Sequence, residues 1–196
     1  MSLVIAVKSG GKVLFGADTQ ATGGYRKMNL TGKTNLKITR MPCGVIVGHA
    51  GSVNATNSLS KHPEWFSDMP EGKLTKRFLV TVILPKLIRE LREKGLLEKD
   101  GSPDMKMTGG FLLAQGDGLF QISRTLGVFE IPVCAAIGCG KFAADAVFCD
   151  ENDKRSAEEK LMSALRLAER YDTNVSGPFV LIDTADSEYR ITEDRK

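Results

Sequence analysis

The chain has 196 residues, of which 42% are hydrophobic and 26% are charged, proportions that are ordinary for a globular protein and exclude the disordered and fibrous classes. The formal net charge is only +3, which argues against nucleic acid as a partner. The apolar runs are too short to span a membrane or to form a signal core. We therefore expect one domain over residues 1–196, located in the cytoplasm and without a membrane partner.

Histidine and cysteine are too few and too scattered for the common metal sites. The two histidines, His49 and His62, do not form an HExxH motif, so a zinc hydrolase has no ligand set. The cysteines form no CxxC pair and lie in or beside apolar segments, as small hydrophobic residues do. We expect no metal site, and reduced thiols at Cys43, Cys134, Cys139 and Cys149.

The chain begins with a predicted β-hairpin. Two apolar runs, Leu3–Lys8 and Lys12–Asp18, flank a Ser-Gly-Gly sequence at residues 9–11 that is typical of a tight turn. Both runs are apolar at successive positions and not only at alternate ones, so both faces of their sheet should be covered. Two further strands are predicted near Asn35–Arg40 and Gly44–Gly48.

Two helices are predicted after these strands. Ser52 could cap the first helix, and Pro63 marks where that helix must have ended. The second is predicted from Thr75 to Gly95, with a bend at Pro85. Its apolar residues recur at helical spacing and should face the core; they are Leu79, Val82, Ile83, Leu87 and Leu91.

The second half of the chain repeats the order of strands and then helices. A short helix is predicted at Lys141–Phe148, and a capping box at Ser156 and Glu159 predicts the start of an amphipathic one. Strands are predicted at Gly110–Ala114, Leu119–Ser123, Gly127–Ile131, Cys134–Ile137, Phe179–Asp183 and Glu188–Ile191. This order suits an α+β fold, in which two antiparallel sheets lie between helix layers in a four-layer αββα sandwich.

Two glycine motifs could suggest a cofactor, and both are weak. Thr31–Thr34 resembles the end of a phosphate-binding loop, but Lys27 stands where that motif needs its first glycine. Gly138–Ala143 matches a relaxed dinucleotide fingerprint, yet no clear βαβ unit follows it. We therefore predict no organic cofactor.

The second residue carries a possible nucleophile. A hydrolase can use the first residue of its mature chain when that residue is Ser, Thr or Cys, because the free α-amine then serves as a base, directly or through water. The pKa of an α-amine is about 8, so much of it is unprotonated at mildly alkaline pH. Removal of Met1 would leave Ser2 with a hydroxyl and such an amine.

The segments Ser2–Ala6, Lys12–Thr22 and Thr34–Ser52 resemble the opening of proteasome β-type subunits and bacterial HslV. In that family a nucleophilic threonine begins an apolar strand, and the second strand ends in an Asp-Ser-Arg-Ala-Thr-like segment. Residues 18–22 read Asp-Thr-Gln-Ala-Thr, and Asp18 follows Ser2 by 16 positions, as the family's aspartate follows its threonine. The resemblance implies the N-terminal nucleophile (Ntn) hydrolase fold. Ser2 is then either the nucleophile itself or the place of a native threonine.

The resemblance also implies a catalytic lysine. The family carries it in a Thr-x-x-Lys-aliphatic strand, which residues 34–38 match with Lys37. Lys33 is the rival assignment, because the preceding loop is about three residues longer than in the family. In this reading the Lys37 ammonium favours deprotonation of the hydroxyl, and Asp18 holds and neutralises the lysine.

A Gly-His-Ala-Gly sequence at residues 48–51 matches the family's Gly-x-Ala-Gly. By this resemblance the backbone N–H of Gly51 is the oxyanion donor. Because glycine has no side chain, the substrate carbonyl can approach this N–H closely. The same alignment assigns four residues to substrate binding: Ala21, Thr22, His49 and Val53.

Three further site residues come from the second half. Cys139 stands in Gly-Cys-Gly where the family has Gly-Ser-Gly, and a thiol is a weaker hydrogen-bond donor than a hydroxyl. Asp172 and Ser176 match the family's Asp-x-x-Ser-Gly-Gly, although here the spacing is one residue longer and proline replaces the last glycine.

The resemblance implies a threonine-type or serine-type endopeptidase that encloses its site in a homo-oligomeric ring or stacked rings. Its substrate would be unfolded polypeptide, and the family suggests an ATP-dependent unfoldase as a further partner. Two alternatives stay open: a catalytically silent structural subunit of the same fold, and an Ntn amidase acting on a small amide. The pair of Asp18 and Lys37 argues against the silent subunit.

Overall fold

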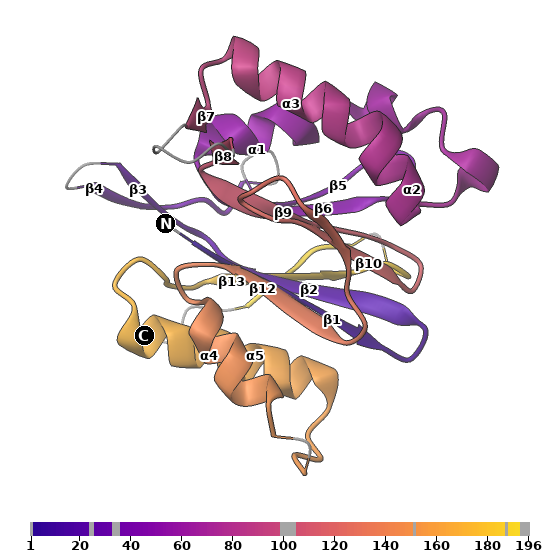
Figure 1. Ribbon diagram of the computed structural model, residues 1–196. Helices are drawn as coiled ribbons and strands as arrows, with labels where there is room; N and C mark the ends of the chain where they lie inside the picture. Colours follow the sequence, from indigo (N-terminus) through magenta and orange to yellow (C-terminus); the bar gives the residue numbers. More distant parts are fainter. Residues whose placement is uncertain are drawn as a thin grey trace.

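The computed structural model describes residues 2–23, 26–32, 36–98, 105–150, 152–186 and 188–192. Two five-stranded antiparallel sheets lie at its centre (Figure 1). Sheet I has the order β12-β1-β2-β13-β14, formed by Cys134–Gly138, Leu3–Ser9, Lys12–Asp18, Phe179–Asp183 and Arg190–Ile191. Sheet II has the order β11-β10-β9-β6-β5, formed by Val128–Glu130, Gly118–Ile122, Gly109–Gln115, Ile46–Gly51 and Ile38–Arg40.

Helices lie on the outer side of each sheet (Figure 1). Sheet II is covered by α1 (Val53–Ser60), α2 (Lys76–Phe78) and α3 (Leu84–Glu93), with a π-helical segment, Leu79–Ile83, between the last two. Sheet I is covered by α4 (Lys141–Phe148) and α5 (Ala157–Tyr171). The remaining elements are 3₁₀ turns at Pro63–Phe66 and Pro70–Gly72, a hairpin of β3 (Gln20–Gly23) and β4 (Arg26–Asn29), and a short pair of β7 (Leu97–Glu98) and β8 (Lys106–Met107).

The side chains of β1 show why its sequence is apolar at every position. Leu3 and Ile5 pack with α5 residues such as Leu165, whereas Val4 and Ala6 pack toward sheet II. All four are fully buried. The expectation that both faces of this sheet are covered is therefore confirmed, and the strand is rigidly held from its first residues onward.

Several predicted boundaries match the structure. The first hairpin and α4 agree with their predicted ranges to within a residue. Ser156 Oγ accepts from the backbone N–H of Glu159 at 3.2 Å, and Glu159 Oε2 accepts from the N–H of Ser156 at 2.8 Å. The capping box thus begins α5, as its sequence indicates.

Other parts of the chain differ from the prediction. The long helix expected from Thr75 is divided into α2, the π-helical segment and α3, and the π-helical segment ends just before Pro85, which lies in the first turn of α3. Proline lacks the N–H that would continue the hydrogen-bond ladder, so the distortion falls in the preceding turn. The strand expected at Gly44–Gly48 begins later and extends to Gly51. The β3–β4 hairpin was not predicted as strands.

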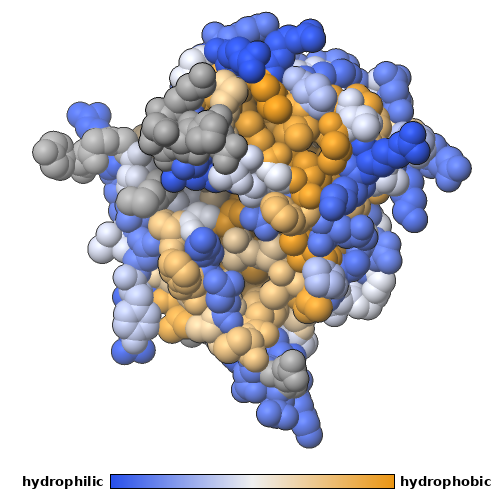
Figure 2. Space-filling view, viewed as in Figure 1, coloured by the Kyte–Doolittle hydropathy of each residue, from blue (hydrophilic) through white to orange (hydrophobic). Residues whose placement is uncertain are grey.

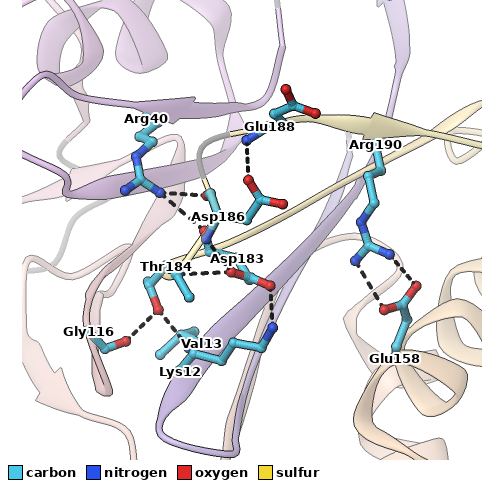
Figure 3. A network of polar contacts seen from close by, with 11 residues as sticks. Lys12, Val13, Arg40, Gly116, Glu158, Asp183, Thr184, Asp186, Glu188 and Arg190 are labelled. Carbon is cyan, nitrogen blue, oxygen red and sulfur yellow. Dashed lines mark hydrogen bonds and ion pairs between the residues drawn. The ribbon is translucent and has the colours of Figure 1, made fainter.

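A polar network ties the two sheets together near the end of β13 (Figure 3). Arg40 of sheet II donates to the carbonyl oxygens of Asp183, at 3.2 Å, and Asp186, at 2.7 Å. The Asp183 carboxylate accepts from Lys12 Nζ at 2.6 Å. Thr184 Oγ1 accepts from a backbone N–H of β2 and donates to the carbonyl of Gly116. These contacts join sheet I to sheet II at the end of β13.

Among the helices that the structure describes, none has the length and apolar character needed to cross a membrane.

Candidate active site

A cavity of about 530 Å³ opens beside the start of β1. Its walls come from the β3–β4 hairpin, the segment leading into β5, the end of β6 and one face of α1. The residues that line it are Ser2, Gln20, Ala21, Thr22, Met28, Leu30, Leu36, Lys37, Thr39, His49, Gly51, Val53, Thr56, Asn57, Ser60 and Lys61. Most of the residues that sequence reasoning assigned to the site therefore share one cavity.

Asp18 and Lys37 form a buried ion pair. Lys37 Nζ donates to Asp18 Oδ2 at 2.7 Å and to the carbonyl oxygen of Gln20 at 2.5 Å. The other carboxylate oxygen of Asp18 accepts from the backbone N–H of Leu3 at 2.7 Å. The Asp18 side chain is fully buried and that of Lys37 is 10% exposed. The Asp18 carboxylate thus holds Lys37 close to Leu3, the residue that follows Ser2.

Burial perturbs both members of this pair. It raises the pKa of Asp18, against the opposing effects of the Lys37 charge and hydrogen bond. It lowers the pKa of Lys37, and here the charge and hydrogen bond of Asp18 oppose it. Loss of either partner would leave an uncompensated charge in a buried position. A buried lysine with a lowered pKa beside a candidate nucleophile is typical of a catalytic site, where its ammonium group can stabilise a developing negative charge.

Ser2 is buried, and its carbonyl is held by the turn after β12. The backbone N–H of Cys139 donates to Ser2 O at 2.9 Å, and Cys139 Sγ lies 3.4 Å from the same oxygen. Gly138 has φ of 104°, and a Cβ at this position would collide with Ser2 O. Only glycine allows this close approach.

Gly51 closes the other side of the cavity with a similarly restricted backbone. Its φ is 148°, and a side chain there would collide with the carbonyl oxygen of Thr108. Gly51 pairs with Gly109 at the end of the β6–β9 ladder. The structure therefore brings Gly51 to the cavity that contains Ser2, as the resemblance implied.

Asp172 reaches this region through Cys139. The carboxylate accepts from the backbone N–H and side-chain amide of Asn174 at 2.9 and 3.0 Å. Although burial opposes the shift, hydrogen bonds from Cys139 and Asn174 hold the pKa of Asp172 below its usual value. Burial, followed by the interaction with Asp172, raises the pKa of the Cys139 thiol. Ser176 contributes its carbonyl oxygen, which accepts from the N–H of Thr19 at 3.4 Å.

Sequence reasoning missed several residues of the cavity. One face of α1 supplies Thr56, Asn57 and Ser60, and Lys61 follows directly after the helix. Gln20 contributes a backbone carbonyl to Lys37. The helical spacing from Val53 onward could have identified this face, since residues three and four apart share one side of a helix. The rival lysine, Lys33, lies outside the described residues.

A second hollow lies on the outer side of sheet I. It has a volume of about 490 Å³, and α4 and α5 line it with apolar side chains that include Phe142, Leu167 and Tyr171. Phe142 is 71% exposed and Tyr171 is 76% exposed. Figure 2 shows hydrophobic residues gathered in the lower half of the visible face, over α4. Cys139 and Asp172 also border this hollow.

The described residues contain no cluster of three or more His, Cys, Asp or Glu side chains that could hold a metal ion. The four cysteines are all free.

No protein-family model and no curated protein matches the chain. Solved structures do. The match with BPH from Thiobacillus denitrificans, a bacterial proteasome homologue, has a TM-score of 0.72 and 21% sequence identity. It covers 92% of this chain and 96% of the BPH chain. This chain has the fold of the proteasome homologue. HslV from Trypanosoma brucei gives a TM-score of 0.68 at 19% identity, with 92% and 98% of the two chains covered.

The same Thiobacillus protein is also known in complex with epoxomicin, and that structure matches with a TM-score of 0.72, 19% identity and coverage of 92% and 97%. The proteasome and HslV resemblance expected from the opening segments is thus confirmed at the level of the fold. Identities near 20% leave the chemistry of this chain to be argued from its own residues.

Proposed function

We propose that this chain is a subunit of a self-compartmentalising endopeptidase of the proteasome and HslV type, with Ser2 as its N-terminal nucleophile. The observation that carries the proposal is the buried Asp18–Lys37 pair, bonded to the backbone next to Ser2 inside a cavity. A buried lysine with a bound carboxylate is costly to maintain in a fold that makes no use of it. The four-layer αββα arrangement and a single domain over residues 1–196 are part of the proposal.

In the proposed reaction, Ser2 Oγ attacks the carbonyl carbon of a peptide bond while its proton passes to the free α-amine. The C–N bond then breaks as the leaving amine takes that proton, and water hydrolyses the acyl ester. Lys37 stabilises the developing alkoxide, and Asp18 keeps the lysine in place and charged. The backbone N–H of Gly51 stabilises the oxyanion, a contribution of about 3 kcal/mol for one such donor.

Cys139, Asp172 and Ser176 support the nucleophile in this proposal. The backbone N–H of Cys139 fixes the carbonyl of Ser2, and Asp172 orients the Cys139 thiol. The substrate-binding residues are Ala21, Thr22, His49 and Val53, which line the same cavity as Ser2. No metal or organic cofactor takes part in any step.

The proposal also includes a ring or stacked rings of this chain, which admit unfolded polypeptide and receive it from an ATP-dependent unfoldase. The fold shared with HslV and the proteasome homologue supports this assembly. The free cysteines suit a reducing compartment, which supports the cytoplasm as its location.

The test is intact mass spectrometry with and without a peptide epoxyketone or β-lactone, on protein expressed from its native start codon. We expect one adduct on each chain that has lost Met1, and no adduct on a Ser2→Ala variant. A chain that has lost Met1, forms rings and stays unmodified would contradict the proposal and favour a silent structural subunit. Hydrolysis of a small amide without peptide-inhibitor labelling would favour the amidase.

A further inference from the structure

The two members of the buried ion pair come from different sheets. Asp18 is the last residue of β2 in sheet I, whereas Lys37 lies directly before β5 of sheet II. The carbonyl oxygen of Lys37 accepts from the backbone N–H of His49 at 2.9 Å, so its backbone follows sheet II, while its Nζ reaches Asp18 Oδ2 at 2.7 Å. The position of the lysine charge therefore depends on how β5 lies against sheet I.

Strand β5 is held weakly by its own sheet. It has three residues, lies at the edge of sheet II and pairs with β6 alone. The outer side of an edge strand has no ladder of backbone hydrogen bonds. Of its three residues, Ile38 is buried and the other two are half-buried. Contacts from outside sheet II must therefore fix the outer side of β5.

Arg40, the last residue of β5, makes such contacts (Figure 3). Its Nη1 donates to the carbonyl oxygens of Asp183, at 3.2 Å, and Asp186, at 2.7 Å. Its backbone N–H donates to the hydroxyl of Tyr189 at 2.8 Å, and the Tyr189 side chain packs against the apolar core between the sheets. We call these three hydrogen bonds the Arg40 clasp, which joins β5 to the loop between β13 and β14.

The loop that receives Arg40 is held by hydrogen bonds of its own. The Asp183 carboxylate is buried and accepts from the backbone N–H groups of Ala185 at 2.8 Å and Asp186 at 2.7 Å. Lys12 of β2 donates to the same carboxylate at 2.6 Å. The two carbonyl oxygens are thus placed by sheet I, and Arg40 binds to a preformed acceptor site.

Within the described part of the chain, two sets of hydrogen bonds connect β5 and its lead-in to sheet I and the loop after β13. One is the bond from Lys37 to Asp18, and the other is the Arg40 clasp. Arg40 is not among the described residues that line the cavity, so it does not touch a substrate there. Any effect of Arg40 on the reaction must therefore pass through the position of β5.

We propose that Arg40 is a positioning residue, which holds β5 against sheet I through the clasp and so places Lys37 Nζ at Asp18. This inference rests on the proposed function, in which Lys37 stabilises the developing alkoxide of Ser2. Such stabilisation needs a charge fixed in advance at the right distance. A displacement of about 1 Å, caused by a residue far from the chemistry, is enough to slow a reaction severely.

The test measures the rate and the endpoint of labelling by a peptide epoxyketone. Arg40→Met removes the guanidinium and keeps an unbranched side chain; the rate should fall by about tenfold, whereas the endpoint stays at one adduct per chain. Lys12→Met is the matched control, because it makes a similar change at a cation that binds Asp183 from sheet I. Its rate should stay within about twofold of the parent.

A milder variant serves if Arg40→Met does not fold. Tyr189→Phe deletes one hydroxyl of the clasp and should slow labelling by about threefold, as expected for a single hydrogen bond. A parent-like rate in both variants would overturn the inference. So would a lower endpoint reached at the parent rate constant, because it would show that Arg40 only keeps the chain folded.

A double-mutant cycle tests whether Arg40 acts through Lys37. In a Lys37→Ala background no ammonium group remains to be placed, so adding Arg40→Met should change the residual labelling rate by less than about twofold. A tenfold loss that persists in this background would overturn the inference, because Arg40 would then act on another group.

Hydrogen exchange separates this inference from the function on which it rests. Mass spectrometry of the full chain should show exchange over residues 36–41 that is about tenfold faster in Arg40→Met and unchanged in Lys12→Met. A labelled parent with parent-like labelling and exchange in Arg40→Met would refute the positioning role and leave the peptidase intact. An unlabelled parent, with faster exchange of this segment in Arg40→Met, would refute the peptidase and keep Arg40 as the residue that places Lys37.

Discussion

At the scale of single residues, the position of Asp18 follows from the hairpin that carries it. In the antiparallel register of β1 and β2, Val4 lies opposite Ala17, so Asp18 falls opposite Leu3 and next to Ser2. A short turn leaves no freedom in this register, so the spacing of 16 residues on which the resemblance rests also brings Asp18 close to Ser2. Gln20 and Thr56 were missed because their roles depend on contacts across the cavity, which no local pattern records.

Lys37 is the residue whose replacement tests the site most directly. Lys37→Ala removes the charge that Asp18 holds beside Ser2, so inhibitor labelling should fall by about a hundredfold or more, because the developing alkoxide loses its electrostatic stabilisation. Labelling is measured as the rate of adduct formation by intact mass. Lys33→Ala is the matched control and should label normally. The opposite result would assign the catalytic lysine to position 33.

The pH profile should report the Asp18–Lys37 pair. Burial lowers the pKa of Lys37, so labelling should decline on the alkaline side at a pH below the ordinary lysine value of about 10.4. Asp18→Asn removes the negative charge that opposes this shift, and the alkaline decline should then begin at a still lower pH. The rate of inhibitor labelling between pH 6 and 11 gives both curves. An identical decline in the parent and in Asp18→Asn would show that another group titrates.

At the scale of elements, the sequence predicts the strands best where burial is complete. β1, β2 and β13 were identified from continuous apolar runs because both of their faces are covered. The β3–β4 hairpin has a largely exposed second strand, so it lacks the periodicity by which strands are recognised. The π-helical segment was missed for another reason, since its apolar stripe is the same as that of a regular helix.

The turn after β12 fixes the position of Ser2, the residue that precedes β1. Gly138→Ala would place a methyl group against Ser2 O at a backbone angle that other residues rarely adopt. We expect the free energy of unfolding to fall by about 1–3 kcal/mol, with loss of labelling because Ser2 is displaced. Gly32→Ala meets no atom within 4 Å and is the control, which should change stability by less than about 0.5 kcal/mol. Chemical denaturation measures both, and equal stability of the two variants would contradict this role of Gly138.

At the scale of the whole molecule, the order of strands and helices sufficed to predict two antiparallel sheets with helices, and the shared fold confirms this. The sequence could not predict how the sheets are tied together. The contacts of Arg40 with the carbonyl oxygens of Asp183 and Asp186 join residues more than 140 positions apart. Every residue has a backbone carbonyl, so no residue type in the sequence indicates which carbonyl oxygens will accept hydrogen bonds from Arg40.

The apolar hollow between α4 and α5 provides a test of the proposed assembly. Phe142 and Tyr171 are exposed aromatic side chains on a surface that also contains Leu167, and apolar patches of this kind mark interfaces between proteins. Phe142→Glu and Tyr171→Glu should each shift the chain toward smaller species in sedimentation velocity, because they place a charge in a contact that excludes water. Phe129→Glu changes an exposed aromatic on β11, outside this hollow, and should leave the distribution unchanged. Rings that persist in both α4 and α5 variants would show that the subunits meet through another surface.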